Sequence, residues 1–208
     1  HEMGHAVHLL LSRVNEYDLG SFSVDWDVVE FPSQFLESFI TNPDVLRRLG
    51  KHYKTGETIP DDLINRIIAA DRFQKGLFLV RQLELGIFDL ELYQKDSVTK
   101  QSVQDILNDV RKRIAVISYP EYHKFQNSFT HIFGGGYAAG YYSYLWAESL
   151  AADAYLAFDG NPFNKELSYK YRDTILAGGD SKPMNELYKD FLGRDPDPAS
   201  LLKYHGLK

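Results

Sequence analysis

The chain opens with the stretch HEMGHAVHLLL at residues 1–11, whose first five residues form an H-E-x-x-H motif. His1 and His5 are four residues apart, so on a helix both imidazoles lie on one face, one turn from each other. Two imidazoles in this arrangement can share one Zn²⁺ at roughly 2.0–2.1 Å. The stretch therefore predicts an N-terminal helix that carries a zinc site.

Glu2 lies beside this histidine pair. From there its carboxylate can reach a metal-bound water and take its proton, so the motif indicates a metallopeptidase. The alternative is a solvated helix with scattered histidines, because a chain with 7 His in 208 residues can produce such a motif by chance.

The composition limits both the partners and the metal ligands of this chain. A length of 208 residues with 44% hydrophobic residues suits one domain with a sizeable core, with a division into two lobes as the alternative. The net charge is -6 and no run of five basic residues occurs, which disfavours a nucleic-acid binder. The chain has no cysteine, so only His, Asp and Glu are available as metal ligands.

Neither a membrane segment nor a targeting segment is visible in the sequence. No apolar run approaches 18 residues, so no membrane association is expected. No signal peptide is recognisable either, and we expect a cytoplasmic protein. Because the chain starts at His1 rather than at a methionine, we also expect it to be a fragment of a longer polypeptide or a processed chain.

Helical patterns dominate the whole chain, and no strand with period-2 alternation stands out. Gly134, Gly135 and Gly136 form a predicted flexible turn. The sequence therefore predicts an all-α domain. Helices are expected at residues 1–14, 33–40, 43–50, 60–71, 73–94 (interrupted by glycines), 102–116, 137–158, 163–177, 183–192 and 198–204.

Glu30 is the candidate for the third metal ligand, because two histidines leave a catalytic zinc one protein ligand short. It lies at the start of the second predicted helix, between Val29 and Phe31, where an isolated carboxylate is costly unless it is paired or metal-bound. The alternative is an ordinary acidic residue at a helix N-terminus, where the helix dipole favours it.

A second candidate cluster contains His131, the three glycines at 134–136, and three tyrosines. On one helix, Tyr137, Tyr141 and Tyr144 share a face, so that phenol and imidazole donors can converge on the oxyanion of a tetrahedral intermediate. The glycine loop can move over a substrate. The alternative is an aromatic stripe that packs in the core.

Three segments in this order along the chain resemble the thimet oligopeptidase family of zinc metallopeptidases: residues 1–10, residues 29–35 (VEFPSQF) and residues 131–146 (HIFGGGYAAGYYSYLW). The last segment is similar to the bacterial oligopeptidase A and peptidyl-dipeptidase branch. Residues 81–89 (RQLELGIFD) and 191–194 (FLGR) also resemble that branch. The resemblance implies a multi-helix, zincin-like catalytic domain that hydrolyses short oligopeptides.

The resemblance also implies roles for individual residues. One Zn²⁺ per chain is bound by His1, His5 and Glu30, with Glu2 as the catalytic base. His131, Tyr137 and Tyr144 contact the substrate or the developing oxyanion. Gly135 and Tyr141 are substrate-binding residues.

Members of this family are much longer and form two helical halves around a channel. Residues 1–208 therefore correspond to the C-terminal catalytic part, and the absent N-terminal half is an expected partner alongside short peptide substrates. Two alternatives to an active enzyme stay open: a catalytically incomplete zinc- or peptide-binding fragment, and a structural helical domain with a coincidental motif. His8 is expected to support the site rather than bind metal, and Glu37 either orients a ligand histidine or is solvated.

Overall fold

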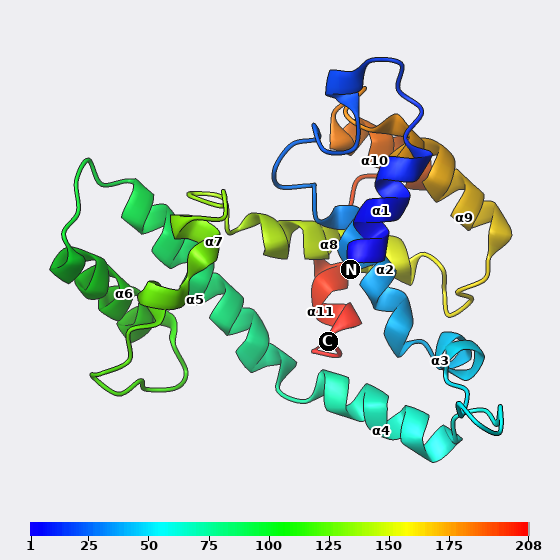
Figure 1. Ribbon diagram of the computed structural model, residues 1–208, viewed down its shortest axis with the longest axis horizontal. Helices are drawn as coiled ribbons and strands as arrows, with labels where there is room; N and C mark the ends of the chain where they lie inside the picture. The colour runs from blue at the N-terminus through cyan, green and yellow to red at the C-terminus, as the bar shows by residue number, and fades with distance from the viewer. Residues whose placement is uncertain (208) are drawn as a thin grey trace. The chain divides into compact units, whose positions relative to one another are not determined.

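The structure is a computed structural model that describes residues 1–207, and within that range it is helical with no strand beyond one isolated bridge (Figure 1). The all-α prediction is therefore confirmed. The chain divides into two compact units. The first unit consists of His1–Phe73 with Trp146–Lys208, and the second of Gln74–Leu145.

The first unit contains the predicted zinc helix and most of the C-terminal helices. Short 3₁₀ turns connect several of its helices, and a π-helical turn, η4, continues α9. Its elements are α1 (Glu2–Leu11), η1 (Tyr17–Leu19), α2 (Phe31–Ser38), η2 (Phe39–Thr41), α3 (Pro43–Leu49), α4 (Asp61–Arg72), α9 (Lys165–Tyr171), η4 (Arg172–Leu176), α10 (Met184–Leu192) and α11 (Ala199–Tyr204).

An aromatic core holds this unit together. Phe31 and Phe35 on α2 are buried among side chains of α8 (Ser143–Leu156), η4 and α10. Phe35 stacks on Tyr171 with ring centroids 4.1 Å apart. Residues that begin α2 are thus fixed by the core on one side. This burial fixes the backbone from which Glu30 projects.

The second unit is built on two long helices that pack against each other, α5 (Lys75–Tyr93) and α6 (Lys100–Ile114), followed by η3 (Phe125–Ser128) and α7 (Thr130–Phe133). Thr99 and Ser102 form a capping box at the start of α6. The core includes Phe88, Leu107 and Ile132, and is separate from that of the first unit. The expected interruption of α5 by glycines is wrong, since the helix is continuous.

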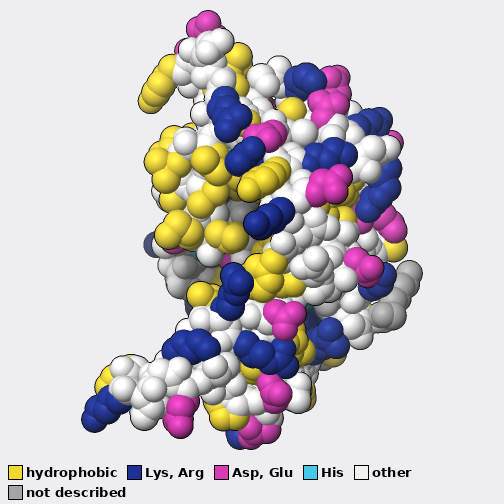
Figure 2. All heavy atoms as spheres, turned by 90° about the vertical axis from the view of Figure 1, so that its right-hand side faces the viewer, with side chains coloured by type: hydrophobic (Ala, Val, Ile, Leu, Met, Phe, Trp, Pro, Cys, Tyr) yellow, Lys and Arg dark blue, Asp and Glu magenta, His cyan; other side chains and the backbone are white. Residues whose placement is uncertain are grey.

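Helix α8 (Ser143–Leu156) begins in the second unit and continues into the first. The sequence predicted this helix from residue 137, and that start is wrong by six residues because 137–142 form turns. Among the described residues, no helix combines the length and apolar character needed to cross a bilayer. On the face drawn in Figure 2, basic and acidic side chains are interspersed.

Candidate metal centre and aromatic cluster

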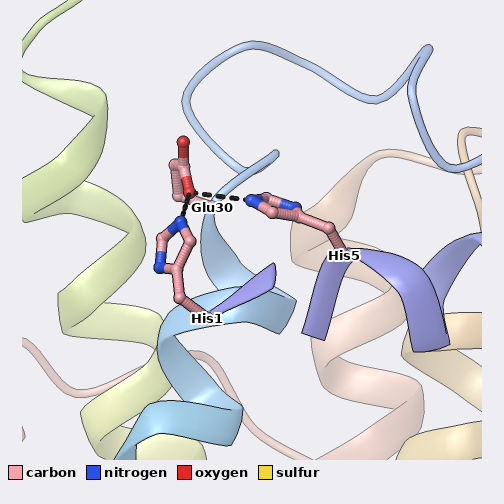
Figure 3. A group of neighbouring side chains, drawn as sticks. All are labelled: His1, His5 and Glu30. Carbon is pink, nitrogen blue, oxygen red and sulfur yellow. Dashed lines mark ion pairs between the residues drawn. The ribbon is translucent and has the colours of Figure 1, made fainter. Parts of the chain in front are cut away.

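Three side chains of the first unit converge on one point. His1 lies at the N-cap of α1 and His5 one turn further on. The Nε2 atoms of both histidines are each 3.2 Å from Oε2 of Glu30. Figure 3 draws these two contacts as dashed lines. One ligand atom from each residue lies within 4.8 Å of the other two. The structure thus brings together the three residues that the sequence suggested as ligands.

Glu30 is held in place by its own helix. Glu30 immediately precedes α2. Pro32 fits in the first turn of α2, because backbone N–H groups in that turn have no acceptor within the helix. Its side chain is buried, and the Ser33 hydroxyl lies 2.9 Å from both Glu30 Oε2 and the Glu30 carbonyl oxygen. The alternative, an acid placed at the helix N-terminus only because the helix dipole favours it, does not account for this burial. Sequence reasoning missed Ser33, although a hydroxyl three residues after a candidate ligand is a usable signal.

The two separations from Glu30 Oε2 fit a tetrahedral metal, while the three ligand atoms as a set lie within 4.8 Å of one another. Two ligand atoms at roughly 2.0–2.1 Å from a tetrahedral Zn²⁺ lie roughly 3.3 Å from each other. The two 3.2 Å separations from Glu30 Oε2 are close to that length. Two imidazole nitrogens and one carboxylate oxygen are also the donor set of many catalytic zinc sites, which leave a fourth position open.

Glu37 strengthens this reading through the tautomer of His1. Its Oε1 lies 2.5 Å from Nδ1 of His1. A carboxylate only accepts hydrogen bonds, so the proton of a neutral His1 is on Nδ1 and its Nε2 carries a lone pair. That lone pair faces Glu30 Oε2, and two acceptors at 3.2 Å repel each other. A cation between them, or a second proton on His1, removes the repulsion.

Gly4 allows α1 to lie directly on α2. A Cβ atom built on Gly4 is 2.5 Å from Cα of Ser33 and 2.6 Å from the carbonyl oxygen of Pro32, both backbone atoms. Backbone cannot move aside as a flexible side chain can. The glycine inside the H-E-x-x-H motif is therefore required by packing between the two helices that carry the cluster.

Gly4→Ala is expected to force α1 away from α2 and to lower the free energy of unfolding by about 1–3 kcal/mol, the usual cost of overpacking. The change also displaces His1 and His5 from Glu30, so zinc affinity is expected to fall. Urea unfolding and zinc titration measure the two effects. Gly56→Ala is a control for added volume, since nothing lies within 4 Å of a Cβ there, although its positive φ adds strain. Unchanged stability and zinc affinity in Gly4→Ala contradict the packing argument.

Glu2 and His8, two other polar residues of α1, lie outside the group of three candidate ligands. Glu2 is exposed in the first turn and is outside the three-residue cluster. His8 is buried, and burial together with nearby His5 lowers its pKa to about 4. Its Nε2 has no hydrogen-bond partner among the described residues. His8 is therefore a neutral, packed histidine at ordinary pH, without the hydrogen bond from Nε2 that would orient a ligand.

The second unit gathers the other predicted residues. The ring of His131 lies 6.1, 5.7 and 5.8 Å, centroid to centroid, from the rings of Tyr137, Tyr141 and Tyr144. Tyr137 stacks on Tyr144 at 4.8 Å. His131 is exposed and the three tyrosines are half-buried. We call these four side chains the aromatic cluster.

The sequence analysis placed the three tyrosines of this cluster on one face of a single helix, and that prediction is wrong. Tyr137 and Tyr141 precede α8, so they do not share a helix face with Tyr144. Turns in the backbone bring the rings together instead. Tyr137 and Tyr141 also pack against the core of the second unit, so the core-packing alternative holds in part for these two rings. Burial raises the pKa of the Tyr141 hydroxyl, and the nearby Tyr144 raises it further by a smaller amount. The Tyr141 hydroxyl donates a hydrogen bond to Gln82 Oε1.

Gly135 shapes the turn that follows α7. Its N–H donates to the carbonyl oxygen of Thr130 at 2.7 Å. A Cβ atom at Gly135 would lie 3.2 Å from backbone atoms of His131 and Thr130, tighter than most such contacts. The glycine thus brings the chain back against His131, which carries the exposed imidazole.

Sequence reasoning missed Asp89, a buried acid of α5 whose carboxylate accepts hydrogen bonds from the backbone N–H groups of Ala139 and Tyr141.

Known proteins similar to this chain are peptidases. Residues 1–207 match peptidase family M3. Oligopeptidase A of Salmonella typhimurium is 42% identical over 211 residues, and saccharolysin of Saccharomyces cerevisiae is 41% identical over 211 residues. Dipeptidyl carboxypeptidase of Escherichia coli is 34% identical over 215 residues. Each alignment covers 100% of this chain but only 31%, 30% and 31% of the respective relative.

Proposed function

Because this chain belongs to peptidase family M3, we propose that it is the catalytic part of a zinc-dependent peptidase that hydrolyses short oligopeptides. It spans about a third of the length of its curated relatives, so residues 1–208 would supply the C-terminal part of a longer enzyme. The remaining part of that polypeptide and peptide substrates are the partners that this proposal requires.

The observation that carries the proposal is the convergence of His1, His5 and Glu30. Two nitrogens face one buried carboxylate oxygen at 3.2 Å, while Glu37 directs the lone pair of His1 towards the same point. Such a donor set favours one Zn²⁺ per chain. A structural ion pair explains this geometry less well than a metal site, because an ion pair needs an extra proton on each imidazole.

A Zn²⁺ held by His1, His5 and Glu30 would supply an activated water and would polarise the scissile carbonyl. Glu2 does not belong to the three-residue cluster, and its exposed carboxylate is available as the general base. In this role Glu2 accepts a proton from the attacking water and delivers it to the leaving amine. Ser33 and Glu37 keep the ligand side chains in place through their hydrogen bonds.

The aromatic cluster is proposed to bind substrate. The imidazole of His131 and the hydroxyls of Tyr137 and Tyr144 are hydrogen-bond donors that can stabilise an oxyanion. Gly135 and Tyr141 are proposed to contact the peptide. The stacking of Tyr137 on Tyr144 supports a preformed arrangement of these donors.

The relatives differ in the compartment and the reaction that their names indicate. Some are called oligopeptidase A and others dipeptidyl carboxypeptidase. Two plant relatives are called cytosolic and organellar. We propose an oligopeptidase, because the bacterial oligopeptidase A relatives are 41–42% identical and the dipeptidyl carboxypeptidases 34–35%. We propose a cytoplasmic location, as the name of the cytosolic plant relative indicates for that protein.

Hydrolysis of a short, internally quenched peptide by the full-length polypeptide tests the proposal. We expect turnover that is lost with a chelator and restored by Zn²⁺, with one zinc per chain by elemental analysis. Because this chain spans only about 31% of its relatives, the 208-residue chain is assayed in parallel. Zinc binding without turnover by the short chain alone identifies it as a catalytically incomplete fragment. No zinc and no turnover in the full-length protein overturn the proposal.

Glu37→Gln is expected to weaken zinc binding by about 10–100-fold, because the amide no longer fixes the His1 tautomer as a carboxylate does. The measurement is a competition titration with a zinc chelator of known affinity. Glu166→Gln, an exposed acid on α9, is the control for loss of one negative charge. Equal zinc affinities in the two variants contradict the role of Glu37.

A further inference from the structure

One face of α5 holds the backbone that carries the aromatic cluster. Gln82, Asp89 and Tyr93 are spaced by seven and four residues, which places them on the same side of the helix. The hydroxyl of Tyr141 donates to Gln82 Oε1 at 3.2 Å, and the hydroxyl of Tyr93 donates to the carbonyl oxygen of Ile132. Asp89, between them, makes the central contacts.

Asp89 binds the turn that joins α7 to α8. Its Oδ1 accepts the N–H of Ala139 and its Oδ2 accepts the N–H of Tyr141, both at 2.9 Å. Its side chain is fully buried. Burial raises the pKa of this carboxyl, while the backbone N–H groups of Tyr141, Ala139 and Gly140 oppose the rise. A buried acid is costly unless such donors satisfy it, so the turn and Asp89 depend on each other.

The turn needs this support because its backbone is strained. Gly136 has φ 85° and Ala139 has φ 54°, both in the left-handed region. Glycine adopts that region readily, but for alanine it costs about 1–2 kcal/mol. The local sequence alone favours a helix from residue 137. The N–H groups of Ala139 and Tyr141 donate hydrogen bonds to the Asp89 carboxylate, 50 and 52 residues earlier, and these bonds select the turn instead.

We propose that Asp89 is a positioning residue that sets the aromatic cluster before substrate binds, an inference that rests on the proposed function. Asp89 fixes the amides of Ala139 and Tyr141, and these residues lie between Tyr137 and Tyr144. The stacking of Tyr137 on Tyr144 and the edge-on packing of Tyr141 on His131 follow from that backbone. Any movement of the glycine loop is then confined to residues 134–136, ahead of the anchored turn.

Hydrogen exchange tests the anchor without any need for activity. In Asp89→Asn the side-chain oxygen can accept one of the two N–H groups, while its own NH₂ group faces the other. We expect the amides of Ala139 and Tyr141 to exchange at least about 10-fold faster than in the wild-type protein. Glu84→Gln is the matched control, since Glu84 is also a buried acid of α5 but pairs with Arg81 and Arg111. Unchanged exchange at Ala139 and Tyr141 in Asp89→Asn overturns the proposal.

Steady-state kinetics of the full-length enzyme separate positioning from general stability. A misplaced catalytic group costs on the order of 10²-fold in rate, so kcat of Asp89→Asn is expected to fall by about that factor with KM little changed. Glu84→Gln, compared at an equal drop in melting temperature, is expected to retain more of its kcat. If both variants lose the same kcat, Asp89 is structural only and the proposal is wrong. If the wild-type enzyme shows no hydrolysis, the proposed function fails, while the exchange result still decides whether Asp89 anchors the turn.

Discussion

Glu2→Gln is expected to lower kcat of the full-length enzyme by about 10²–10⁴-fold, the usual cost of losing a general base, while zinc stays bound. Glutamine keeps the shape of the side chain but cannot accept a proton. Glu2 is exposed on the first turn of α1 and lies outside the cluster of His1, His5 and Glu30. Its loss should therefore affect proton transfer and not metal affinity. The increase in fluorescence on cleavage of a quenched peptide gives the rate, and elemental analysis gives the zinc content.

His5→Ala is the informative comparison for this prediction. His5 Nε2 is one of the two nitrogens at 3.2 Å from Glu30, so its removal is expected to abolish both zinc binding and activity. The two variants thus separate the base from a ligand. A Glu2→Gln enzyme with near-normal turnover would falsify the proposed mechanism, and one that loses its zinc would make Glu2 part of the metal site.

Local patterns in the sequence predicted much of the first unit. The i, i+4 spacing of His1 and His5 needs only helical geometry, and Asn42 with Pro43 marks the start of α3 because its side chain accepts the first free N–H groups. Glu30 could be chosen because a carboxylate between apolar neighbours at a helix start requires a partner. These signals act within a few residues, so they are readable from the chain itself.

The turn at residues 137–142 could not be predicted in the same way. Its sequence suits a helix, and the three tyrosines at helical spacing reinforce that reading. The competing force comes from Asp89, which is 50 residues away from Ala139 and accepts its N–H. A lone acid in the apolar pattern of α5 was the available signal, but nothing in the sequence shows which amides it binds. The division into two units depends on such distant contacts as well.

The structure also changes what the tyrosines are expected to do. If Tyr137, Tyr141 and Tyr144 shared one helix face, all three would be equivalent candidates for the core or for catalysis. Tyr137 and Tyr141 pack against the core of the second unit, whereas Tyr144 contacts the other cluster rings from the first turn of α8. Tyr144 is therefore the tyrosine whose hydroxyl can be removed with the least disturbance of that core.

Tyr144→Phe is expected to lower kcat by about 10²–10³-fold with KM little changed, because it removes one donor to the oxyanion of the transition state. The phenylalanine ring keeps the stacking on Tyr137 and the contact with His131, so a packing role predicts almost no effect. Kinetics on a short quenched peptide measure the change, with melting temperature and zinc content as checks. Tyr122→Phe, an exposed tyrosine of the same unit, is the control for loss of a hydroxyl. A kcat equal to that of the control, or a loss matched by lower stability, means that Tyr144 acts through packing alone.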